Sequence, residues 1–354
     1  MRYRLLEERG DRELSRMHYL VTGHTGFKGA WLSLLLLARG HRVSGIALDP
    51  RPGALFEVAG VEAQLSNDIR CDIRNQSRVA EAVSHISPDV VIHLAAQPLV
   101  RESYRVPRET FETNVMGTLN VLEAVSITPG VQANVIVTTD KVYRNVGQRQ
   151  GYVESDPLGG YDPYSASKAM ADILTHSWVA SFPGVPTAIA RAGNVIGGGD
   201  VSPDRLLPDL LAAFAEGREA NIRHPGAVRP WQHVLDCLNG YLLLVDALLD
   251  GRGEGEWNFG PGAESFVSVG DIADLAAELW GGNAGWSADA GNHPHEAALL
   301  SLDASKAQHE LGWHDRLPFP LGLEWTVGWQ RKVANGDSPE SVTVKQIADF
   351  EAMQ

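Results

Sequence analysis

Short apolar runs alternate with helical patterns through the first half of the chain. Four runs rich in β-branched residues predict buried strands, at 18–23, 41–49, 89–96 and 134–139. Helical periodicity follows them, at 28–39, 77–86, 111–125 and from Tyr164 onward. Strands that are apolar throughout are buried on both faces. The pattern therefore predicts an α/β fold with a Rossmann-type, doubly wound parallel sheet.

The alternation weakens after about residue 196, where Gly, Pro and Trp become frequent. Seven of the nine tryptophans lie beyond residue 230. We expect a smaller, mixed α/β lobe there that binds a substrate and does not fold alone, because its helices at 206–216 and 235–249 need partners. The predicted division is a charged N-terminal arm at 1–16, a Rossmann domain at 17–195, the second lobe at 196–333 and a polar, loosely attached tail at 334–354.

Composition places the 354-residue chain among globular proteins, because 44% of its residues are hydrophobic and 21% are charged. A net charge of −14 argues against a nucleic-acid partner, which needs a basic face. The first 16 residues lack the apolar core of a signal peptide, and no apolar run approaches the ~18 residues that span a bilayer. Only two cysteines occur, Cys71 and Cys237, which fits a reducing compartment. We expect a cytoplasmic protein with no membrane partner.

A glycine-rich loop joins the first predicted strand to the first helix. Gly23, Gly26 and Gly29 lie in GHTGFKG, where small residues let the backbone approach a pyrophosphate at a helix N-terminus. Asp49 follows 20 residues after Gly29. A carboxylate there accepts hydrogen bonds from ribose hydroxyls and repels a 2′-phosphate, which favours NAD over NADP, although the nearby Arg51 weakens this inference. Glycines used only for turns are the alternative, but the position between strand and helix favours a dinucleotide site.

Tyr164 and Lys168 lie four residues apart in YSASK and share one face of a predicted helix. A neighbouring ammonium favours the phenolate of a tyrosine, whose pKa is about 10 in isolation. Such a tyrosine can take a proton from a sugar hydroxyl while a hydride leaves for NAD⁺, and the lysine suits the nicotinamide-ribose hydroxyls. An exposed helix pair is the alternative. The position downstream of a nucleotide-binding half-sheet favours the catalytic interpretation.

Four polar residues end the strand before this helix: Thr138, Thr139, Asp140 and Lys141. Ligands of doubly wound sheets bind at the carboxyl ends of the strands, so these residues are expected to face the same cleft as Tyr164. Thr139 can hydrogen-bond a substrate oxygen beside the tyrosine. Asp140 and Lys141 form a pair able to act as acid and base. A strand-end capping cluster with a solvated ion pair is the alternative.

These motifs resemble the extended short-chain dehydrogenase/reductases, and among them the nucleotide-sugar 4,6-dehydratases of the branch that acts on CDP-glucose. The resemblance runs from His18 to about Trp329. Its most specific segments are VTGHTGFKGAWLS (21–33), HLAAQPLVRESY (93–104), TNVMGTLNVLEA (113–124), TTDKVY (138–143), PLGGYDPYSASKA (157–169), RAGNVIGGGD (191–200) and RPWQHV (229–234).

The resemblance implies a reaction in three steps on CDP-glucose or a related nucleotide sugar. Tyr164, assisted by Lys168 and Thr139, promotes oxidation at C4 by NAD⁺. Water is then eliminated across C5 and C6, with Asp140 protonating the departing hydroxyl, and hydride returns to C6 to give a 4-keto-6-deoxy sugar. Lys141 stands where related enzymes have a glutamate as the C5 base, so the identity of this base is open. Burial and a nearby cation would help to lower the pKa of Lys141.

The resemblance also implies which residues bind. The expected cofactor contacts are Gly23, Thr25, Gly26, Phe27, Lys28, Gly29, Asp49, Asp72, Ile73, Leu94, Ala95, Ala96, Gln97, Asn114, Thr138, Tyr164, Lys168 and Arg191. The expected substrate contacts are Gln97, Thr139, Asn194, Arg205 and Arg229. A homodimer is implied through helices near 107–125 and 164–181, although their apolar faces fit an ordinary core equally well. His293 and His295 are interpreted as loop histidines, and no metal site is expected.

Two further functions stay open. One is a same-fold enzyme with another outcome, a 4-epimerase or a dehydratase of a different nucleotide sugar. An epimerase needs no acid/base pair for elimination, so Asp140 and Lys141 favour the dehydratase. The other is an inactive Rossmann protein that binds a dinucleotide as a sensor. The intact Tyr164, Lys168 and Thr139 argue against it.

Overall fold

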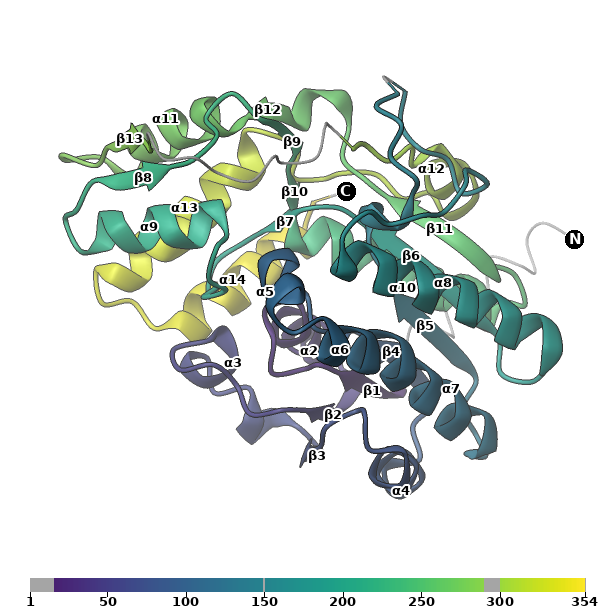
Figure 1. Cartoon of the computed structure of the whole chain (residues 1–354). Coiled ribbons are helices and arrows are strands. Elements are labelled where there is room, and N and C mark those ends of the chain that lie inside the picture. The colour runs from purple at the N-terminus through teal and green to yellow at the C-terminus, as the bar shows by residue number, and fades with distance from the viewer. Residues whose placement is uncertain (1–15, 149, 290–299, 354) are drawn as a thin grey trace, which may run out of the picture.

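The computed structural model describes residues 16–148, 150–289 and 300–353. At its centre lies a parallel sheet of seven strands in the order β11–β6–β5–β4–β1–β2–β3 (Figure 1). In chain order, the strands are β1 (His18–Thr22), β2 (Arg42–Ala47), β3 (Asn67–Arg70), β4 (Val90–His93), β5 (Ala133–Val137), β6 (Thr187–Ala192) and β11 (Gly255–Phe259). The predicted doubly wound α/β fold is confirmed.

Helices cover both faces of this sheet, because successive strand residues point to opposite sides. In β1, Tyr19 and Val21 belong to the core on one face, and Leu20 belongs to the core on the other. The first face is covered by α2 (Phe27–Ala38), α10 (Val234–Leu249) and α14 (Pro339–Glu351). The second face is covered by α4 (Gln76–Ile86), α7 (Gly117–Ile127) and α8 (Pro163–Ser181). The uninterrupted apolar runs of the strands follow from this double cover.

Short helices fill the connections between these elements. They are α3 (Leu55–Val58), η1 (Glu62–Gln64), α5 (Val100–Arg105), α6 (Pro107–Phe111) and η2 (Glu112–Met116). The predicted helix at 111–125 therefore begins as a π-helical turn, η2, and continues as α7. A π-helical turn inside an α-helix shifts the side chains that follow, and such turns are frequent at functional sites. Here η2 carries Asn114, which is buried.

The second lobe contains three two-stranded sheets, β7–β10, β9–β12 and β8–β13. Its strands are β7 (Val195–Ile196), β8 (Ala220–Ile222), β9 (Val228–Pro230), β10 (Gln232–His233), β12 (Phe266–Ser268) and β13 (Trp286–Ala288). Its helices are α9 (Leu206–Ala215), η4 (Ala263–Ser265), α11 (Val269–Trp280) and α13 (Leu321–Ala334), while α12 (Ser305–Leu311) lies against β11. Leu210, Phe214, Ile272 and Leu323 form its core. The lobe sits beside the carboxyl end of the sheet in Figure 1.

Residues 234–259 depart from the predicted division of the chain. They were assigned to the second lobe, but α10 packs on β5 and β6, and β11 pairs with β6 as the edge strand of the central sheet. The chain thus leaves the sheet after β6, starts the second lobe and then returns to complete the sheet. Such a return depends on long-range pairing that local periodicity does not reveal.

The predicted polar, loosely attached tail at 334–354 is wrong for most of its length. Residues 339–351 form α14, which begins behind the N-cap Ser338 and packs against α2 and α13. Val342, Ile347 and Phe350 are buried on its inner face. Arg39 of α2 also pairs with Glu351 at 2.9 Å. The segment is polar in overall composition, but its apolar residues lie in one narrow stripe along the helix, which the composition does not reveal.

A buried carboxylate at the start of α10 makes stability depend on pH. Burial raises the pKa of Asp236 to about 7, although the amides of Arg316 and Leu317 donate to it at 2.8 and 3.0 Å. The folded state therefore holds this proton more tightly than the unfolded state, whose value is 3.8. The contribution of the Asp236 carboxyl group to the free energy of unfolding is therefore complete below pH 4, and it is lost as the pH rises to about 7.

We expect the free energy of unfolding to fall across this interval by up to about 1.4 kcal/mol per pH unit from this group. Urea unfolding at pH 5, 6, 7 and 8 measures the slope. Buried histidines with lowered pKa, such as His93 and His233, oppose it only below the unfolded value of 6.5. In Asp236→Asn this falling contribution should disappear from the pH dependence, and an identical pH dependence in both proteins would contradict the prediction.

Candidate active site

The glycine loop lies against the end of β4, as the cofactor prediction requires. Gly23 has a φ of +76°, and a Cβ there would lie 2.8 Å from the amide nitrogen of Ala95. Side chains are therefore excluded where the loop meets the segment after β4. This close approach brings Leu94, Ala95 and Ala96 beside the loop that opens α2. This close approach fits the backbone cradle predicted for a pyrophosphate, and the binding itself stays a prediction.

The end of β2 presents the predicted ribose carboxylate to solvent. The Asp49 side chain is 89% exposed, and Arg70 Nε lies 3.6 Å from its Oδ1. Arg70 is in turn held by Asp68 at 2.7 Å, and Asp68 by His24 of the glycine loop at 2.8 Å. The charge next to Asp49 thus comes from Arg70, whereas the sequence had drawn attention to Arg51.

Other predicted cofactor residues are held by neighbours in the fold. Thr25 Oγ1 donates to the carbonyl oxygen of Leu48 at 3.0 Å, and Asp72 accepts from Arg74 Nε at 2.9 Å. Ile73 is buried, and Gly117 leaves room for its side chain. These residues line the loops around the strand ends, where the sequence predicted them.

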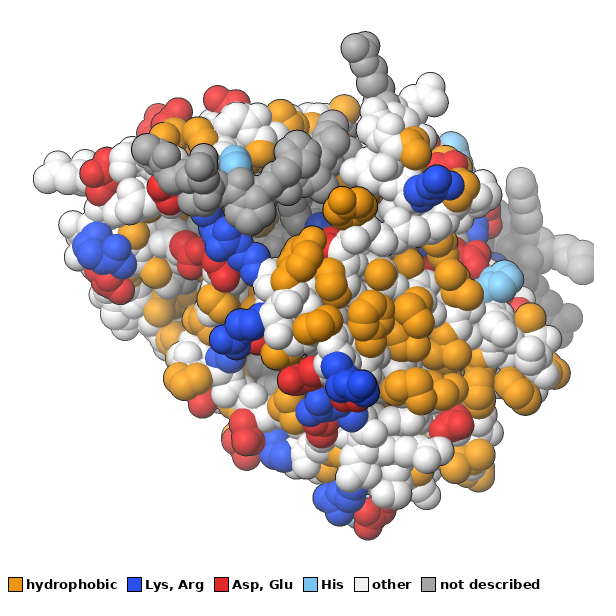
Figure 2. All heavy atoms as spheres, in the orientation of Figure 1, with side chains coloured by type: hydrophobic (Ala, Val, Ile, Leu, Met, Phe, Trp, Pro, Cys, Tyr) orange, Lys and Arg blue, Asp and Glu red, His pale blue; other side chains and the backbone are white. Residues whose placement is uncertain are grey.

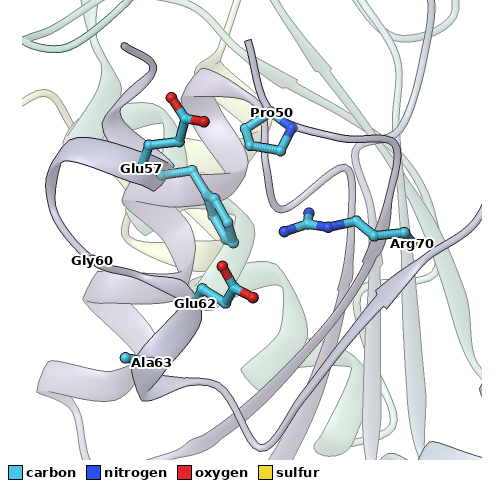
Figure 3. Close-up of a pocket in the computed structure, with 7 residues that line it drawn as sticks. Pro50, Glu57, Gly60, Glu62, Ala63 and Arg70 are labelled. Atoms are coloured by element: carbon cyan, nitrogen blue, oxygen red, sulfur yellow. The ribbon is translucent and has the colours of Figure 1, made fainter. Parts of the chain in front are cut away.

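Beyond Pro50, next to Asp49, lies an open depression of about 590 Å³ (Figure 3). It is lined by Pro50, Phe56, Glu57, Gly60, Glu62, Ala63 and Arg70. The guanidinium of Arg70 points into it and lies 5.1 Å from the centre of the Phe56 ring. None of these lining residues belongs to the predicted site, so the depression adjoins the ribose carboxylate rather than the tyrosine.

The tyrosine and lysine lie on the first two turns of α8. Pro163 at the helix start and Asp162, which accepts from the amide of Ser165 at 2.9 Å, fix where this helix begins. Tyr164 and Lys168 are 9% and 4% exposed. Lys168 Nζ donates to the carbonyl oxygen of Val137 at 2.7 Å. The helix thereby holds both side chains against the end of β5.

Burial and charge shift both groups in the site. Burial raises the pKa of the Tyr164 phenol, while the charge of Lys141 and a hydrogen bond with Thr139 act to lower it. Burial, helped by the charge of Lys28, lowers the pKa of Lys168 to about 8. Lys28 belongs to the glycine loop, so the cofactor loop and the lysine of α8 interact electrostatically. Its ammonium donates to Tyr241 Oη at 3.3 Å.

The polar cluster after β5 forms the short helix η3 (Asp140–Val142). Thr139 Oγ1 and Lys141 Nζ both donate to Asp140 Oδ1, at 2.8 and 3.0 Å. Burial lowers the pKa of Lys141, but the charges of Asp140 and Tyr164 outweigh it, and the pKa is raised. The expectation of a lowered pKa is therefore wrong for this state of the molecule. Lys141 is held as an ammonium by the carboxylate beside it.

Asn114 ties the loop after β4 to α8. Its side chain accepts from the Gln97 amide at 2.8 Å, and it donates to Ser167 Oγ at 2.8 Å. The side-chain amide of Gln97 donates to Thr110 Oγ1 at 2.9 Å and accepts from the Leu99 amide. Asn114 therefore orients this segment, and its contact with the cofactor stays a prediction. The side chain of Gln97 forms hydrogen bonds with residues close to it in the chain, and its contact with a ligand stays a prediction.

The predicted cofactor contact by Arg191 is contradicted. The side chain is 2% exposed and forms a two-pronged ion pair with Asp172, at 2.7 and 2.8 Å. Its remaining donors bind Tyr143 Oη at 2.8 Å and the carbonyl oxygen of Glu154 at 2.9 Å. Thr138 Oγ1 also donates to Asp172, at 3.2 Å. Arg191 supports the site from beneath, because all three of its side-chain nitrogens donate to other residues of the chain.

Asp172 is the residue of this network that the sequence analysis missed. It lies four residues after Lys168 on α8, and its charge acts to raise the pKa of that lysine. The signal was available, because residues at i and i+4 share a helix face. Its partner Arg191 comes from β6, a pairing that the sequence does not reveal.

The predicted phosphate-binding residues lie at the lobe boundary. Arg205 precedes α9 and donates to Asp200 at 3.1 Å, and Arg229 of β9 donates to the carbonyl oxygen of Val228 at 2.9 Å. The charge of Arg205 acts on the pKa of Tyr164, and that of Arg229 acts on the pKa of Lys141. Both arginines therefore lie close enough to the catalytic candidates to act on them electrostatically. Asn194 adjoins them through its carbonyl oxygen, which accepts from the Gln232 amide at 3.3 Å.

Within residues 16–148, 150–289 and 300–353, no helix combines the length and the apolar character that a bilayer crossing requires. Over those same ranges, no three His, Cys, Asp or Glu side chains are grouped as metal ligands. His293, His295 and nearly all of the charged arm at 1–16 lie outside the described residues.

Comparison with known proteins matches residues 19–260 to the NAD dependent epimerase/dehydratase family. CDP-glucose 4,6-dehydratase of Salmonella typhimurium is 44% identical over 341 residues, which cover 93% of this chain and 95% of that protein. The structure of DesIV, a dTDP-glucose 4,6-dehydratase from Streptomyces venezuelae with NAD and TYD bound, has a TM-score of 0.79 at 28% identity, covering 92% of this chain and 100% of that one. A UDP-glucose-4-epimerase from Stenotrophomonas maltophila with bound NAD has a TM-score of 0.80 at 24% identity over 91% of this chain and 100% of its own, which shows a shared fold.

Proposed function

Because this chain belongs to the NAD dependent epimerase/dehydratase family, we propose that it converts CDP-glucose to CDP-4-keto-6-deoxyglucose. The observation that carries this proposal is the Asp140–Lys141 pair beside Thr139 and Tyr164. A 4-epimerase needs only the tyrosine and its lysine, whereas removal of water across C5 and C6 also needs an acid and a base. The choice of the cytidine nucleotide rests on the 44% identity to the Salmonella enzyme.

The residues around the strand ends fit NAD. A side chain at Gly23 would collide with the backbone after β4, so the loop keeps a cradle free for a diphosphate. Asp49 is exposed at the end of β2, where ribose hydroxyls would be its partners. Lys28, Thr25 and the 94–96 segment surround the same cradle. When bound, NAD would supply the acceptor and later the donor of the hydride exchanged between C4 and C6 of the sugar.

Tyr164 acts as the base for the C4 hydroxyl. Its raised pKa disfavours the phenolate, and Lys141 and Thr139 supply the opposing interactions from within the site. Lys168, with a pKa of about 8, adds a further positive charge on the same helix face when protonated. Thr139 is placed to hydrogen-bond the sugar oxygen as its proton departs.

Asp140 and Lys141 share one transferable proton for the elimination. Lys141 is the ammonium and Asp140 the carboxylate, joined at 3.0 Å. As that proton passes through Asp140 to the departing C6 hydroxyl, the Lys141 amine accepts the C5 proton, which the neighbouring C4 ketone has acidified. The electron pair of the C5–H bond forms the C5=C6 double bond while the C6–O bond breaks and water leaves. Lys141 thus ends the step as an ammonium again, having given one proton and taken another.

Mass spectrometry of the purified protein with CDP-glucose tests the proposed function. We expect loss of one water from CDP-glucose and an unchanged mass for the dTDP-, UDP- and GDP-sugars. Loss from another sugar would keep the chemistry and overturn the choice of nucleotide. An isomer of unchanged mass but altered chromatographic mobility would indicate an epimerase. The variant Asp140→Asn further distinguishes a dehydratase from an epimerase. It should abolish dehydration, whereas an epimerase would stay active.

We further propose that the protein works as a homodimer in the cytoplasm, with its two cysteines as free thiols. An apolar face extends over α6–α8 in Figure 2. Its exposed members are Met116, Ile127, Met170, Ile173 and Phe182. Leu122 of α7 is buried and belongs to the core rather than to this face. The helices that carry this face can pack against the same helices of a second subunit as a four-helix bundle, which buries both apolar faces.

Ile173→Glu is expected to convert the dimer to a monomer, because a carboxylate would be buried in the apolar interface. Ile173 is 55% exposed in one chain, so the monomer itself should tolerate the charge. Light scattering coupled to size-exclusion chromatography measures the mass. Val344→Glu on α14, 45% exposed on the opposite face of the sheet, is the matched control and should leave the dimer intact. A variant of Ile173 that keeps the wild-type mass would contradict this interface.

A further inference from the structure

Two arginines from different parts of the chain bind the same carboxylate oxygen. Arg101 of α5 and Arg223, which follows β8, both donate to Asp204 Oδ1, at 3.1 and 3.3 Å. Asp204 lies in the loop between β7 and α9. One aspartate thus links the loop after β4 to the second lobe, and it offers one negative charge to two positive ones. The neighbouring Arg205 is held in the same way by Asp200, at 3.1 Å.

The backbone of Asp204 is held in an unusual conformation. Its φ is +60°, and among the described residues only Ser87 shares a positive φ without being glycine. This left-handed conformation is uncommon for residues with a side chain, although aspartate and asparagine tolerate it best. The loop therefore presents the carboxylate at a backbone cost that the surrounding structure must support.

These ion pairs are exchangeable. The side chains of Arg101, Asp204 and Arg223 are 50%, 45% and 28% exposed, so water reaches each of them. Ion pairs in such positions contribute only about 0–1 kcal/mol. A ligand that brings two negative charges and several acceptor oxygens to the same arginines would replace the single carboxylate, because guanidinium groups bind phosphate oxygens in pairs.

The cluster adjoins, along the chain, a residue that acts on the reaction site. Arg205 is the next residue after Asp204, and its charge acts on the pKa of Tyr164. A nucleotide sugar whose glucose reaches Tyr164 would carry its diphosphate past this end of the cleft. Figure 2 shows basic side chains gathered along the groove between the second lobe and the helices of the sheet.

We propose that Asp204 is an internal substitute for the substrate diphosphate and that Arg101 and Arg223 bind that diphosphate once it displaces Asp204. The inference rests on the proposed function and adds two residues to the substrate site. In the free protein Asp204 keeps the two guanidinium groups together and oriented. When the diphosphate enters, Asp204 releases them and returns to water.

This exchange makes Asp204 a competitor of the substrate. Asp204→Asn, which keeps the left-handed backbone, should lower the dissociation constant of CDP about two- to fivefold, since the competing ion pairs are lost. Arg101→Gln should raise it about tenfold through loss of a charged hydrogen bond. In the Arg101→Gln/Arg223→Gln background, Asp204→Asn should bring no gain, because no arginine is left to release.

Calorimetric titration with CDP, UDP and TDP at two salt concentrations tests the inference, with NAD titrated in parallel. Arg105→Gln is the matched control, since Arg105 lies on the same helix and pairs with Glu102 at 2.8 Å away from Asp204. It should leave all dissociation constants unchanged. A purely structural link between the lobes would make Asp204→Asn bind nucleotide equally or more weakly, which would overturn the inference. The inference would also be overturned if Asp204→Asn tightened nucleotide binding equally in the background without the two arginines. A change in NAD affinity of the same size as the change in nucleotide affinity would overturn it as well.

The same samples separate this inference from the proposed function. If the wild type dehydrates CDP-glucose while Asp204→Asn shows no tighter binding, only the role of Asp204 fails. If the wild type leaves CDP-glucose unchanged, the proposed function fails. The inference is still decided by whether Asp204→Asn tightens the binding of the nucleoside diphosphates only when Arg101 and Arg223 are present.

Discussion

Replacing Tyr164 with phenylalanine is expected to lower kcat about 10²–10⁴-fold, the usual contribution of a positioned acid–base group. The phenol is the group of α8 placed to take the C4 proton, and its 9% exposure leaves little room for water to replace it. KM should change little, because the ring and its packing stay. Initial rates of dehydration over a range of CDP-glucose concentrations measure both constants.

Tyr161→Phe provides the control for this prediction. Tyr161 lies three residues before Tyr164 in the same segment, but it is fully exposed. Its loss should leave kcat unchanged, and both variants should unfold at the same urea concentration as the wild type. Wild-type turnover by Tyr164→Phe would contradict the catalytic role. It would also favour a protein that binds a dinucleotide without using it.

Arg191→Leu is expected to lower the free energy of unfolding by about 3–5 kcal/mol, because removing one partner leaves the other charge buried and uncompensated. Asp172 is 1% exposed and receives two hydrogen bonds from Arg191. The same substitution leaves Tyr143 Oη and the carbonyl oxygen of Glu154 without a donor. Urea denaturation followed by circular dichroism measures the loss.

A second substitution distinguishes charge from packing. Asp172→Asn in the Arg191→Leu background should recover part of the lost stability, because the buried carboxylate is then neutral. Arg218→Leu removes an exposed arginine that pairs with Glu216 and should cost less than about 1 kcal/mol. If the loss for Arg191→Leu were as small as for Arg218→Leu, the buried pair would not hold the site together.

Most of the candidate site could be predicted from short sequence motifs. GHTGFKG predicted a cradle because its glycines stand between a strand and a helix, and the structure places Gly23 against Ala95. The spacing of Tyr164 and Lys168 predicted a shared helix face, and both side chains lie buried on α8. The cluster after β5 followed from the rule that ligands bind at strand ends. Each of these predictions depends on residues within a few positions of one another.

The errors concern partners that are distant in sequence. Arg191 was predicted to contact the cofactor because it lies in a family motif, but its guanidinium forms an ion pair with Asp172 on α8. Lys141 was expected to have a lowered pKa from burial, and the opposite charge of Asp140 reverses the sign. Asp204 and its two arginines meet across 103 and 19 residues of chain. Pairings of this kind depend on tertiary packing, which periodicity does not encode.

The return of the chain to the central sheet sets a condition on its synthesis. A nascent polypeptide that has left the ribosome only as far as β6 lacks β11 at the edge of the sheet and the cover provided by α10 and α14. The face of β5 and β6 on which α10 later packs is then open to water, as is the side of α2 on which α14 later docks. The nucleotide-binding half is therefore completed only when α14, within the last 16 residues of the chain, has emerged and docked on α2. A premature stop codon anywhere before α14 would release a protein with an open core, a substrate for chaperones and proteases rather than a smaller NAD-binding module.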